Sequence, residues 1–214
     1  MPVAPPDGQY SKGTLSRSQL AKDPFAQFQS WFTHAQQNAV YQPETVCLST
    51  ASLPSGRVSA RTVYLKELDK EGFVIYSNFG TSKKGKDLET NKWASLTFHW
   101  RELERQVRIE GLTERMSTEE SQVYFDTRIR GSRIGAWASR QSTVVGEDDV
   151  RDRLHEVEQR FGVQSGDPYD VPLPEFWGGW RVIPQFVSLS ILRFVSSPLH
   201  QRDRVLERET LSAA

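Results

Sequence analysis

The chain has 214 residues, of which 37% are hydrophobic and 25% are charged, and its formal net charge is zero. This length suits a single domain with a sizeable core. The charge balance argues against a nucleic-acid binder that works through a broad basic surface. No apolar run approaches the roughly 18 residues that a membrane span needs, and the start lacks the pattern of a secretory signal, so we expect a cytoplasmic protein.

The number and spacing of the cysteine and histidine residues argue against an intrachain disulfide and against a metal site. A lone cysteine, Cys47, excludes an intrachain disulfide, and because it stands in an apolar, strand-like run we expect its thiol to be buried and inert. The four histidines are far apart, with no pair at metal-ligand spacing. The sequence therefore predicts no metal site.

The first predicted element follows an N-terminal arm, residues 1–22, that is rich in Pro, Gly and Ser and is expected to be flexible. Asp23-Pro24 combines an N-cap side chain with a proline at the first helical position. Three phenylalanines then fall on one face, which predicts a helix that ends near Asn38.

A block of five short strands is predicted next. Turn-forming stretches separate the early segments, which are rich in β-branched and aromatic residues. The five segments are 45–50, 58–66, 72–77, 94–100 and 104–113. A short helix, 82–91, lies between the third and the fourth. Five consecutive strands of this length indicate an antiparallel sheet or a small barrel.

The second half of the chain is predicted to hold two more helices and two strands. Ser117-Thr-Glu-Glu120 forms a capping box, so a helix begins there and is expected to end near Thr127. Apolar residues at helical spacing predict a helix over 147–161, and a loop follows over 162–176. Residues 180–187 and 189–195 are the last predicted strands. The predicted fold class is α+β, mainly β.

Arginine is concentrated in one segment, residues 124–142, which holds four arginines and no lysine. The planar guanidinium matches the geometry of phosphate and stays charged at any working pH. Because Gly, Ser and Gln are interleaved with these arginines, the segment is typical of a site for a small anion. The alternative that composition leaves open is a solvated, structural arginine face.

A second candidate anion site is the glycine- and lysine-containing turn at residues 80–86. It joins a predicted strand to a predicted helix, where backbone N–H groups and the helix dipole favour an anion. Lys83 and Lys84 add positive charge. The turn lacks Walker spacing, which argues against a nucleoside triphosphate site, and a merely solvated turn remains the alternative.

Strand alternation predicts which side chains share a face. Arg61 and Lys66 fall on opposite faces unless a bulge intervenes, so they need not serve the same ligand. Gln106 points away from Val107 and Ile109, which should face the core. An outward glutamine is usually only solvated.

Three residues, on the predicted third helix and just after it, could together bind one phosphate group. Tyr124 and Arg128 are four residues apart and lie on one helix face, and Ser132 follows after a Gly-containing turn. A guanidinium and two hydroxyls can bind a phosphate together. Trp137 and Trp177 are expected to lie in the core rather than to stack on a cofactor, as most large aromatic residues do.

The segment Arg130-Gly-Ser-Arg-Ile-Gly-Ala-Trp-Ala-Ser-Arg-Gln-Ser142 resembles the signature of the pyridoxamine (pyridoxine) 5'-phosphate oxidases, FMN enzymes of vitamin B6 salvage. Other motifs similar to those of the family follow in its order at residues 23–24, 59–66, 75–78, 80–84, 103–107 and 174–182. The resemblance runs from about residue 10 to residue 184. It implies an FMN-binding split barrel over 23–185, an antiparallel Greek-key barrel with flanking helices, in a homodimer that holds its flavins at the interface.

The resemblance also implies roles for particular positions. The positions that match the family's FMN contacts are Arg61, Thr62, Val63, Tyr64, Leu65, Lys66, Tyr76, Ser77, Lys83, Lys84, Gln106, Gln141 and Ser142. Those that match its substrate contacts are Lys66, Tyr124, Arg128, Ser132, Tyr10, His200 and Arg202. Gln106 is expected to reach the flavin across the dimer interface. No residue is expected to act as a nucleophile, since the flavin carries the chemistry.

The implied reaction is the oxidation of pyridoxamine 5'-phosphate and pyridoxine 5'-phosphate to pyridoxal 5'-phosphate, with O2 reduced to H2O2. One alternative is a split-barrel protein of low activity, or one that binds FMN or pyridoxal phosphate without turnover. Another is a related flavin oxidase that acts on a different amine or cyclic metabolite.

The C-terminal segment, 186–214, departs from the family pattern. The family's tryptophan in this region has no counterpart, Pro198 stands where a motif arginine belongs, and residues 210–214 have no match. One hypothesis for so abrupt a boundary is an altered reading frame or a retained intron. The departure predicts weaker FMN binding and slower turnover than in a chain with the full motif.

Overall fold

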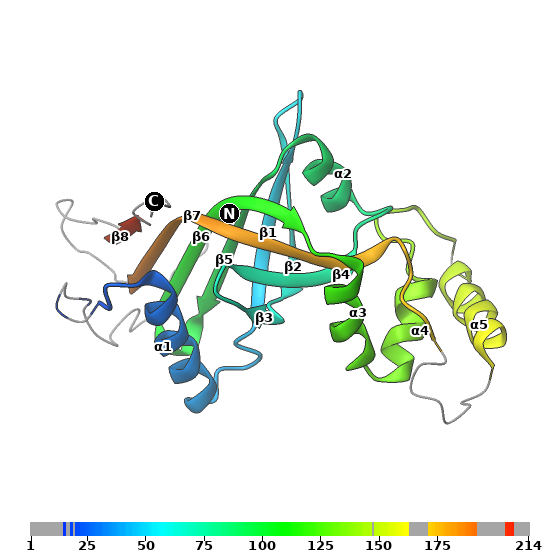
Figure 1. Cartoon of the computed structure of the whole chain (residues 1–214), viewed down its shortest axis with the longest axis horizontal. Helices are drawn as coiled ribbons and strands as arrows, with labels where there is room; N and C mark the ends of the chain where they lie inside the picture. The colour runs from blue at the N-terminus through cyan, green and yellow to red at the C-terminus, as the bar shows by residue number, and fades with distance from the viewer. Residues whose placement is uncertain are drawn as a thin grey trace, which may run out of the picture.

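The fold is an antiparallel sheet that curls into a barrel, with α1 near one end and α3, α4 and α5 gathered near the other (Figure 1). This computed structural model describes residues 15, 18, 20–146, 148–162 and 171–191, and the backbone of 204–207. Most of the predicted arm, 1–22, and most of the segment 186–214 lie outside the described residues. None of the described helices is long and apolar enough to cross a membrane.

The described elements form groups of strands and helices along the chain: four strands follow α1, and three helices precede β7. The strands are β1 (Thr45–Ser52), β2 (Arg57–Tyr64), β3 (Glu67–Leu68), β4 (Phe73–Asn78), β5 (Trp93–Trp100), β6 (Arg105–Arg115), β7 (Trp177–Ile191) and β8 (Arg204–Glu207). The helices are α1 (Pro24–Gln37), α2 (Lys83–Thr90), α3 (Thr118–Asp126), α4 (Arg130–Ala138) and α5 (Asp149–Phe161), with a 3-10 turn, Arg101–Leu103. The predicted α+β barrel with flanking helices is confirmed.

The sheet curls because the chain joins its two edges directly. The strand order is β2-β1-β5-β6-β7-β4-β3, so β2 and β3 lie at opposite edges, yet only Leu65 and Lys66 connect them. The three Cα–Cα steps from Tyr64 to Glu67 span at most about 11 Å, whereas the edges of a flat seven-strand sheet would be about 29 Å apart. At this junction the N–H of Leu65 donates to Glu44 O, and the N–H of Lys66 donates to Val74 O of β4. The curl therefore brings the β2 edge of the sheet close to β4, with no β2–β4 strand pairing among the described residues.

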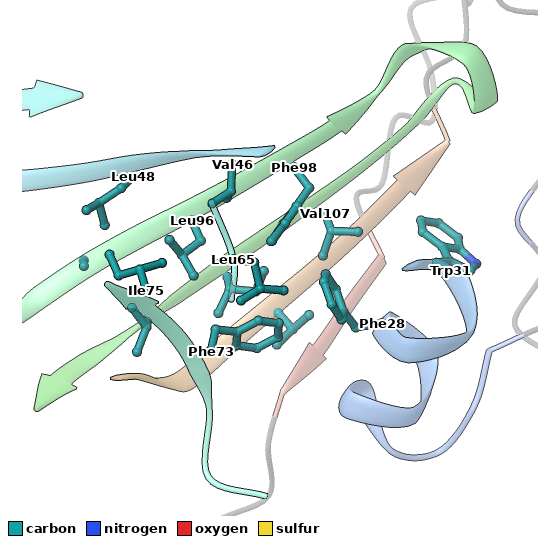
Figure 2. Close-up of a cluster of buried hydrophobic side chains, with 14 of the residues drawn as sticks. Phe28, Trp31, Val46, Leu48, Leu65, Phe73, Ile75, Leu96, Phe98 and Val107 are labelled. Carbon is teal, nitrogen blue, oxygen red and sulfur yellow. The ribbon is translucent and has the colours of Figure 1, made fainter. Parts of the chain in front are cut away.

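The core lies inside this curl, and α1 supplies part of it (Figure 2). Asp23 caps the helix by accepting hydrogen bonds from the N–H groups of Phe25 and Ala26, as its sequence predicts. Phe28 is fully buried, and its ring packs edge-on against Phe73 with the ring centroids 4.9 Å apart. Burying such side chains holds α1 against the strands.

The helices predicted at 24–38, 82–91, 117–127 and 147–161 and the five predicted strands are confirmed with small shifts of their ends. Two details are corrected. The strands predicted at 180–187 and 189–195 form one strand, β7, as far as Ile191, beyond which the next residues are not described. Cys47 is half-buried rather than buried, because it lies on the outer face of β1.

Helix α4 was not predicted, and it replaces the turn expected before Ser132. Gly131 and Gly135 lower the helix propensity of this segment, and Ile129 at the N-cap offers no capping side chain. The backbone N–H of Ser132 nevertheless donates to Ile129 O at 2.9 Å. Ser132 thus lies in the first turn of α4, with its position fixed by a helix.

Candidate active site

A pocket of about 600 Å³ opens between the end of β4, the helices α3 and α4, and the loop that follows α4. Its lining residues are Tyr64, Lys66, Tyr76, Ser77, Asn78, Tyr124, Thr127, Arg128, Ser132, Gly135, Ala136, Ser139, Gln141 and Trp177. Eight of these are residues that the sequence assigned to flavin or substrate binding. A pocket of this volume suits a small organic ligand.

One wall of the pocket is a stack of aromatic rings. The rings of Tyr76 and Tyr124 lie 4.0 Å apart at 18°, and the Trp177 ring continues the stack 5.6 Å from Tyr76. Gly179 makes room for it, because a Cβ at that position would lie 2.8 Å from Cε1 of Tyr76. The hydroxyl of Tyr76 donates to Glu67 Oε1 at 2.9 Å. Burial, together with the Glu67 carboxylate, raises the pKa of Tyr76, so this hydroxyl stays protonated.

The two tryptophans lie in different surroundings. Trp177 is buried beside Phe125, which confirms the predicted core position, but it also forms part of the pocket wall. Trp137 is half-buried and packs between α4 and α5, where its Nε1–H donates to Pro172 O at 2.7 Å. Trp177 therefore both packs in the core and lines the pocket.

Arg128 brings a positive charge to the pocket. Its guanidinium carbon lies 4.8 Å from the centroid of the Trp177 ring, a cation–π geometry. Nη1 is buried and has no hydrogen-bond partner among the residues that the structure describes. Burial lowers the pKa of Arg128, although the neighbouring Tyr124 acts in the other direction. A buried donor left without an acceptor costs about 1–3 kcal/mol, which an anionic ligand would recover.

A second group of cations lies around the N-terminus of α2. Ser82 caps the helix by accepting from Gly85 N–H, as expected for a turn that leads into a helix. Lys84 is 5% exposed, and its ammonium donates to Gln141 Oε1 at 2.5 Å. Burial, and then the charge of Arg61, lower the pKa of Lys84 to about 8. Gln141 also lines the pocket, so it links the pocket to this group.

The loop after α4 is held against α2 and against the end of β4, by one hydrogen bond to each. The backbone N–H of Lys83 donates to Ser142 Oγ at 3.0 Å, and Ser142 has a φ of 62°, a left-handed conformation that a serine adopts at some cost. The side chain of Asn78, at the end of β4, donates to Ser139 O at 2.7 Å. Asn78 ended one of the matched motifs, but the sequence alone gave it no role.

The remaining predicted residues lie outside the pocket lining. Arg61 donates a hydrogen bond to Thr50 near α2, whereas Lys66 lines the pocket. The two side chains therefore lie in different places, as strand alternation predicts. Val63 and Leu65 pack with the core, and Thr62 is exposed on the other face of β2. Gln106 is half-buried on the face of β6 opposite Val107 and Ile109, as predicted. Tyr10, His200 and Arg202 lie outside the described residues.

Comparison with known proteins adds to this geometry. Residues 32–159 match the model of the family described as "Pyridoxamine 5'-phosphate oxidase". A protein of Schizosaccharomyces pombe, named "Probable pyridoxamine 5'-phosphate oxidase", is 52% identical over 184 residues, which cover 85% of this chain and 79% of the relative. The "Pyridoxamine 5'-phosphate oxidase" of Saccharomyces cerevisiae is 46% identical over 96% of this chain and 87% of its own, so that match extends into the segment 186–214.

Solved structures share the fold. The structure of PhzG from Burkholderia lata has a TM-score of 0.73 at 24% identity and covers 82% of this chain and 84% of that one. A pyridoxamine 5'-phosphate oxidase-related, FMN-binding protein of Nostoc punctiforme has a TM-score of 0.62 at 13% identity, with coverage of 79% and 86%. By sequence and by fold, the chain belongs to the pyridoxamine 5'-phosphate oxidase family.

Proposed function

We propose that the chain is an FMN-dependent oxidase that converts pyridoxamine 5'-phosphate and pyridoxine 5'-phosphate to pyridoxal 5'-phosphate and reduces O2 to H2O2. The names of the relatives support this assignment. The observation that carries it is Nη1 of Arg128, which is buried, has no hydrogen-bond partner in the part of the chain that the structure describes, and lies in a pocket also lined by Lys66, Tyr124 and Ser132. A guanidinium, an ammonium and two hydroxyls form a donor set suited to a phosphate monoester.

The residues around α2 fit the phosphate of FMN. Arg61, Lys83 and Lys84 supply positive charge, and Ser142 adds a hydroxyl at the first turn of the helix. Lys84 is a buried ammonium whose described hydrogen bond goes to a neutral amide, so an anion would compensate its desolvation. When bound, FMN supplies the redox chemistry: it accepts two electrons from the substrate carbon and passes them to O2.

The protein's own contribution is position and charge. Lys66, Tyr124, Arg128 and Ser132 would hold the substrate phosphate, and the aromatic wall limits where the pyridine ring can lie. A substrate that is anchored by its phosphate is held in a fixed orientation before it reacts. This positioning lowers the activation barrier by roughly several kcal/mol. No nucleophilic side chain enters this scheme.

We also propose a homodimer with the flavin sites at its interface. The outer face of the sheet carries exposed apolar residues, of which Val58 is 74%, Trp93 50% and Leu112 40% exposed. Trp93 pairs directly with Leu112, and Gln106 lies on the same face of β6. Tyr64, at the end of β2, is 42% exposed and also lines the pocket. A second copy that covers this face would bury the apolar side chains next to the pocket. The cytoplasmic location stays a prediction.

The test begins with the visible spectrum of the purified, FMN-reconstituted protein. We expect flavin absorption, O2 consumption when pyridoxine 5'-phosphate is added, and a matching yield of pyridoxal 5'-phosphate. Bound flavin without turnover would favour the non-catalytic alternative. A chain that takes up no FMN would contradict the proposed function.

A further inference from the structure

Asp87 is a fully buried carboxylate that lies among the cations at the N-terminus of α2. Its exposed fraction is 0%, although it belongs to a helix with exposed residues such as Glu89. Oδ2 accepts hydrogen bonds from Thr50 Oγ1 at 2.7 Å and from Ser59 Oγ at 2.9 Å, and Oδ1 pairs with the ammonium of Lys83. Asp87 thus links β1, β2 and α2.

The same two hydroxyls hold Arg61. Nη1 of Arg61 donates to Thr50 Oγ1 at 2.8 Å and Nη2 donates to Ser59 Oγ at 2.6 Å. Each hydroxyl has one hydrogen, which it gives to Asp87 while its oxygen accepts from Arg61. The guanidinium and the carboxylate are therefore coupled through two bridging hydroxyls, each polarised in the same direction.

These bonds leave a particular edge of Arg61 available. Nη1 also donates to Leu48 O at 3.2 Å, so both of its hydrogens and one of Nη2 are used among the described residues. Nε–H and the second Nη2–H remain, and they lie side by side as the fork that binds a phosphate in a bidentate manner. The hydroxyl bridge therefore determines which edge of Arg61 is presented to a ligand.

The negative charge of Asp87 offsets the mutual repulsion of the three cations Arg61, Lys83 and Lys84. Burial lowers the pKa of Arg61, and the carboxylate of Asp87 acts against that effect. Arg61 in turn contributes to the lowered pKa of Lys84, so the cations affect one another. Without a counter-charge, three neighbouring cations would repel and separate in the absence of flavin.

We propose that Asp87 is a positioning residue of the flavin-phosphate site: it holds Arg61 and Lys83 in place before FMN arrives. This inference rests on the proposed function. A preformed site binds more tightly, because less ordering is required when the ligand binds. Because Asp87 is fully buried behind Thr50, Ser59 and Lys83, it would not itself contact FMN, and its negative charge would repel a phosphate at long range. The proposal therefore predicts that removing this negative charge weakens FMN binding, whereas an account based on net charge predicts tighter binding.

The test compares FMN affinity and dissociation rate in flavin-stripped variants of the full-length protein. Asp87→Asn keeps the shape but places an amide N–H group against Lys83, and we expect FMN to bind about tenfold more weakly with faster dissociation. Glu89→Gln is the matched control, since it removes a negative charge from an exposed position of the same helix and should leave FMN binding unchanged. Asp87→Glu should recover part of the loss.

A double-mutant cycle with Ser59→Ala distinguishes positioning from a general loss of structure. Ser59→Ala removes one bridging hydroxyl and leaves all charges in place, so it remains informative even if Asp87→Asn does not fold. We expect it to weaken FMN binding, and we expect the Asp87→Asn/Ser59→Ala pair to lose less than the sum of the single losses. Unchanged or tighter FMN binding by Asp87→Asn, additive losses, or a Ser59→Ala variant with wild-type affinity would each overturn the proposal. A wild-type chain that binds no FMN would instead overturn the proposed function, and this inference with it.

Discussion

The guanidinium carbon of Arg128 lies 4.8 Å from the centroid of the Trp177 ring, while Nη1 of Arg128 has no hydrogen-bond partner among the described residues. The ring holds the cation from one side, and the pocket lies beside both residues. The two side chains come from segments about fifty residues apart in the chain, which α3 and the start of β7 bring together. An arginine held in this way can bind an anion without first being ordered.

Replacing Arg128 with alanine should raise KM for pyridoxine 5'-phosphate by about tenfold or more, the scale of a hydrogen bond to a charged group. FMN content should stay unchanged, because Arg128 is assigned to the substrate phosphate alone. Steady-state kinetics and the flavin-to-protein ratio measure the two effects separately. Arg140→Ala is the control, since Arg140 is exposed in the same arginine-rich segment. Loss of flavin from Arg128→Ala would show that the two phosphate sites are assigned the wrong way round.

FMN affinity should fall as the pH rises through the pKa of Lys84. Burial, and then Arg61, lower this pKa to about 8, so near pH 9 only about a tenth of the flavin-free protein keeps the ammonium. Binding should therefore weaken up to about tenfold between about pH 7 and pH 9. Lys84→Arg, which stays charged, should remove most of this dependence.

The stability of the flavin-free protein provides a control for that experiment. Because the pKa of Lys84 is lower in the folded chain, the unfolded chain binds more protons between about pH 8 and pH 10. Lys84 therefore makes the free energy of unfolding rise, not fall, over this range. A loss of FMN that coincides with unfolding would not count as titration of Lys84, and a pH-independent affinity in the wild type would contradict the assignment.

The sequence predicted most of the framework but not the connections between its parts. The capping residues Asp23 and Ser117 correctly predict where their helices begin. Strand alternation correctly predicts that Gln106 lies on the outer face of β6. Helix α4 could not be predicted, because its glycines disfavour a helix that tertiary packing stabilises. In the sequence, Asp87 looks like an ordinary surface residue of a charged helix. Only the folded structure brings the hydroxyls of Thr50 and Ser59 next to its carboxylate.

Arg181 should be a major source of stability outside the site. Its side chain is 10% exposed, it contacts Asp69, Glu71 and Glu120, and it pairs with Glu114. Burial acts to lower its pKa, but the hydrogen bonds to Glu114 and Asp69 raise it above the ordinary value. Arg181→Met should lower the free energy of unfolding by about 1–3 kcal/mol near neutral pH, since the partly exposed carboxylates would then repel one another.

The loss caused by Arg181→Met should shrink in acid. Burial acts to raise the pKa of Asp69, but backbone hydrogen bonds from Gly72 and Glu71 and the contact with Arg181 together outweigh it, so this pKa is lowered in the folded chain. The stability that this carboxylate contributes is present above its unfolded pKa of about 3.9 and is lost as the pH falls. Denaturant titrations at two pH values measure the difference, with Lys70→Met as an exposed control. An unchanged midpoint at neutral pH would contradict this role.

A charge on the outer face of the sheet should dissociate the proposed dimer. Leu112→Lys places an ammonium beside Trp93 in the apolar face, and we expect a monomer by sedimentation, together with loss of FMN. Val123→Lys makes the same change at a 71% exposed position of α3 and should leave both properties unchanged. A wild-type monomer that retains FMN at micromolar concentration would contradict the shared site.

The most direct test of the proposed function is an anaerobic half-reaction. The FMN-reconstituted protein is mixed with pyridoxine 5'-phosphate without O2, and flavin absorbance is followed with time. We expect the absorbance to bleach, pyridoxal 5'-phosphate to form in equal amount, and the colour to return when air is admitted. Flavin that stays oxidised with saturating substrate would contradict the assignment of this chain as a pyridoxamine 5'-phosphate oxidase.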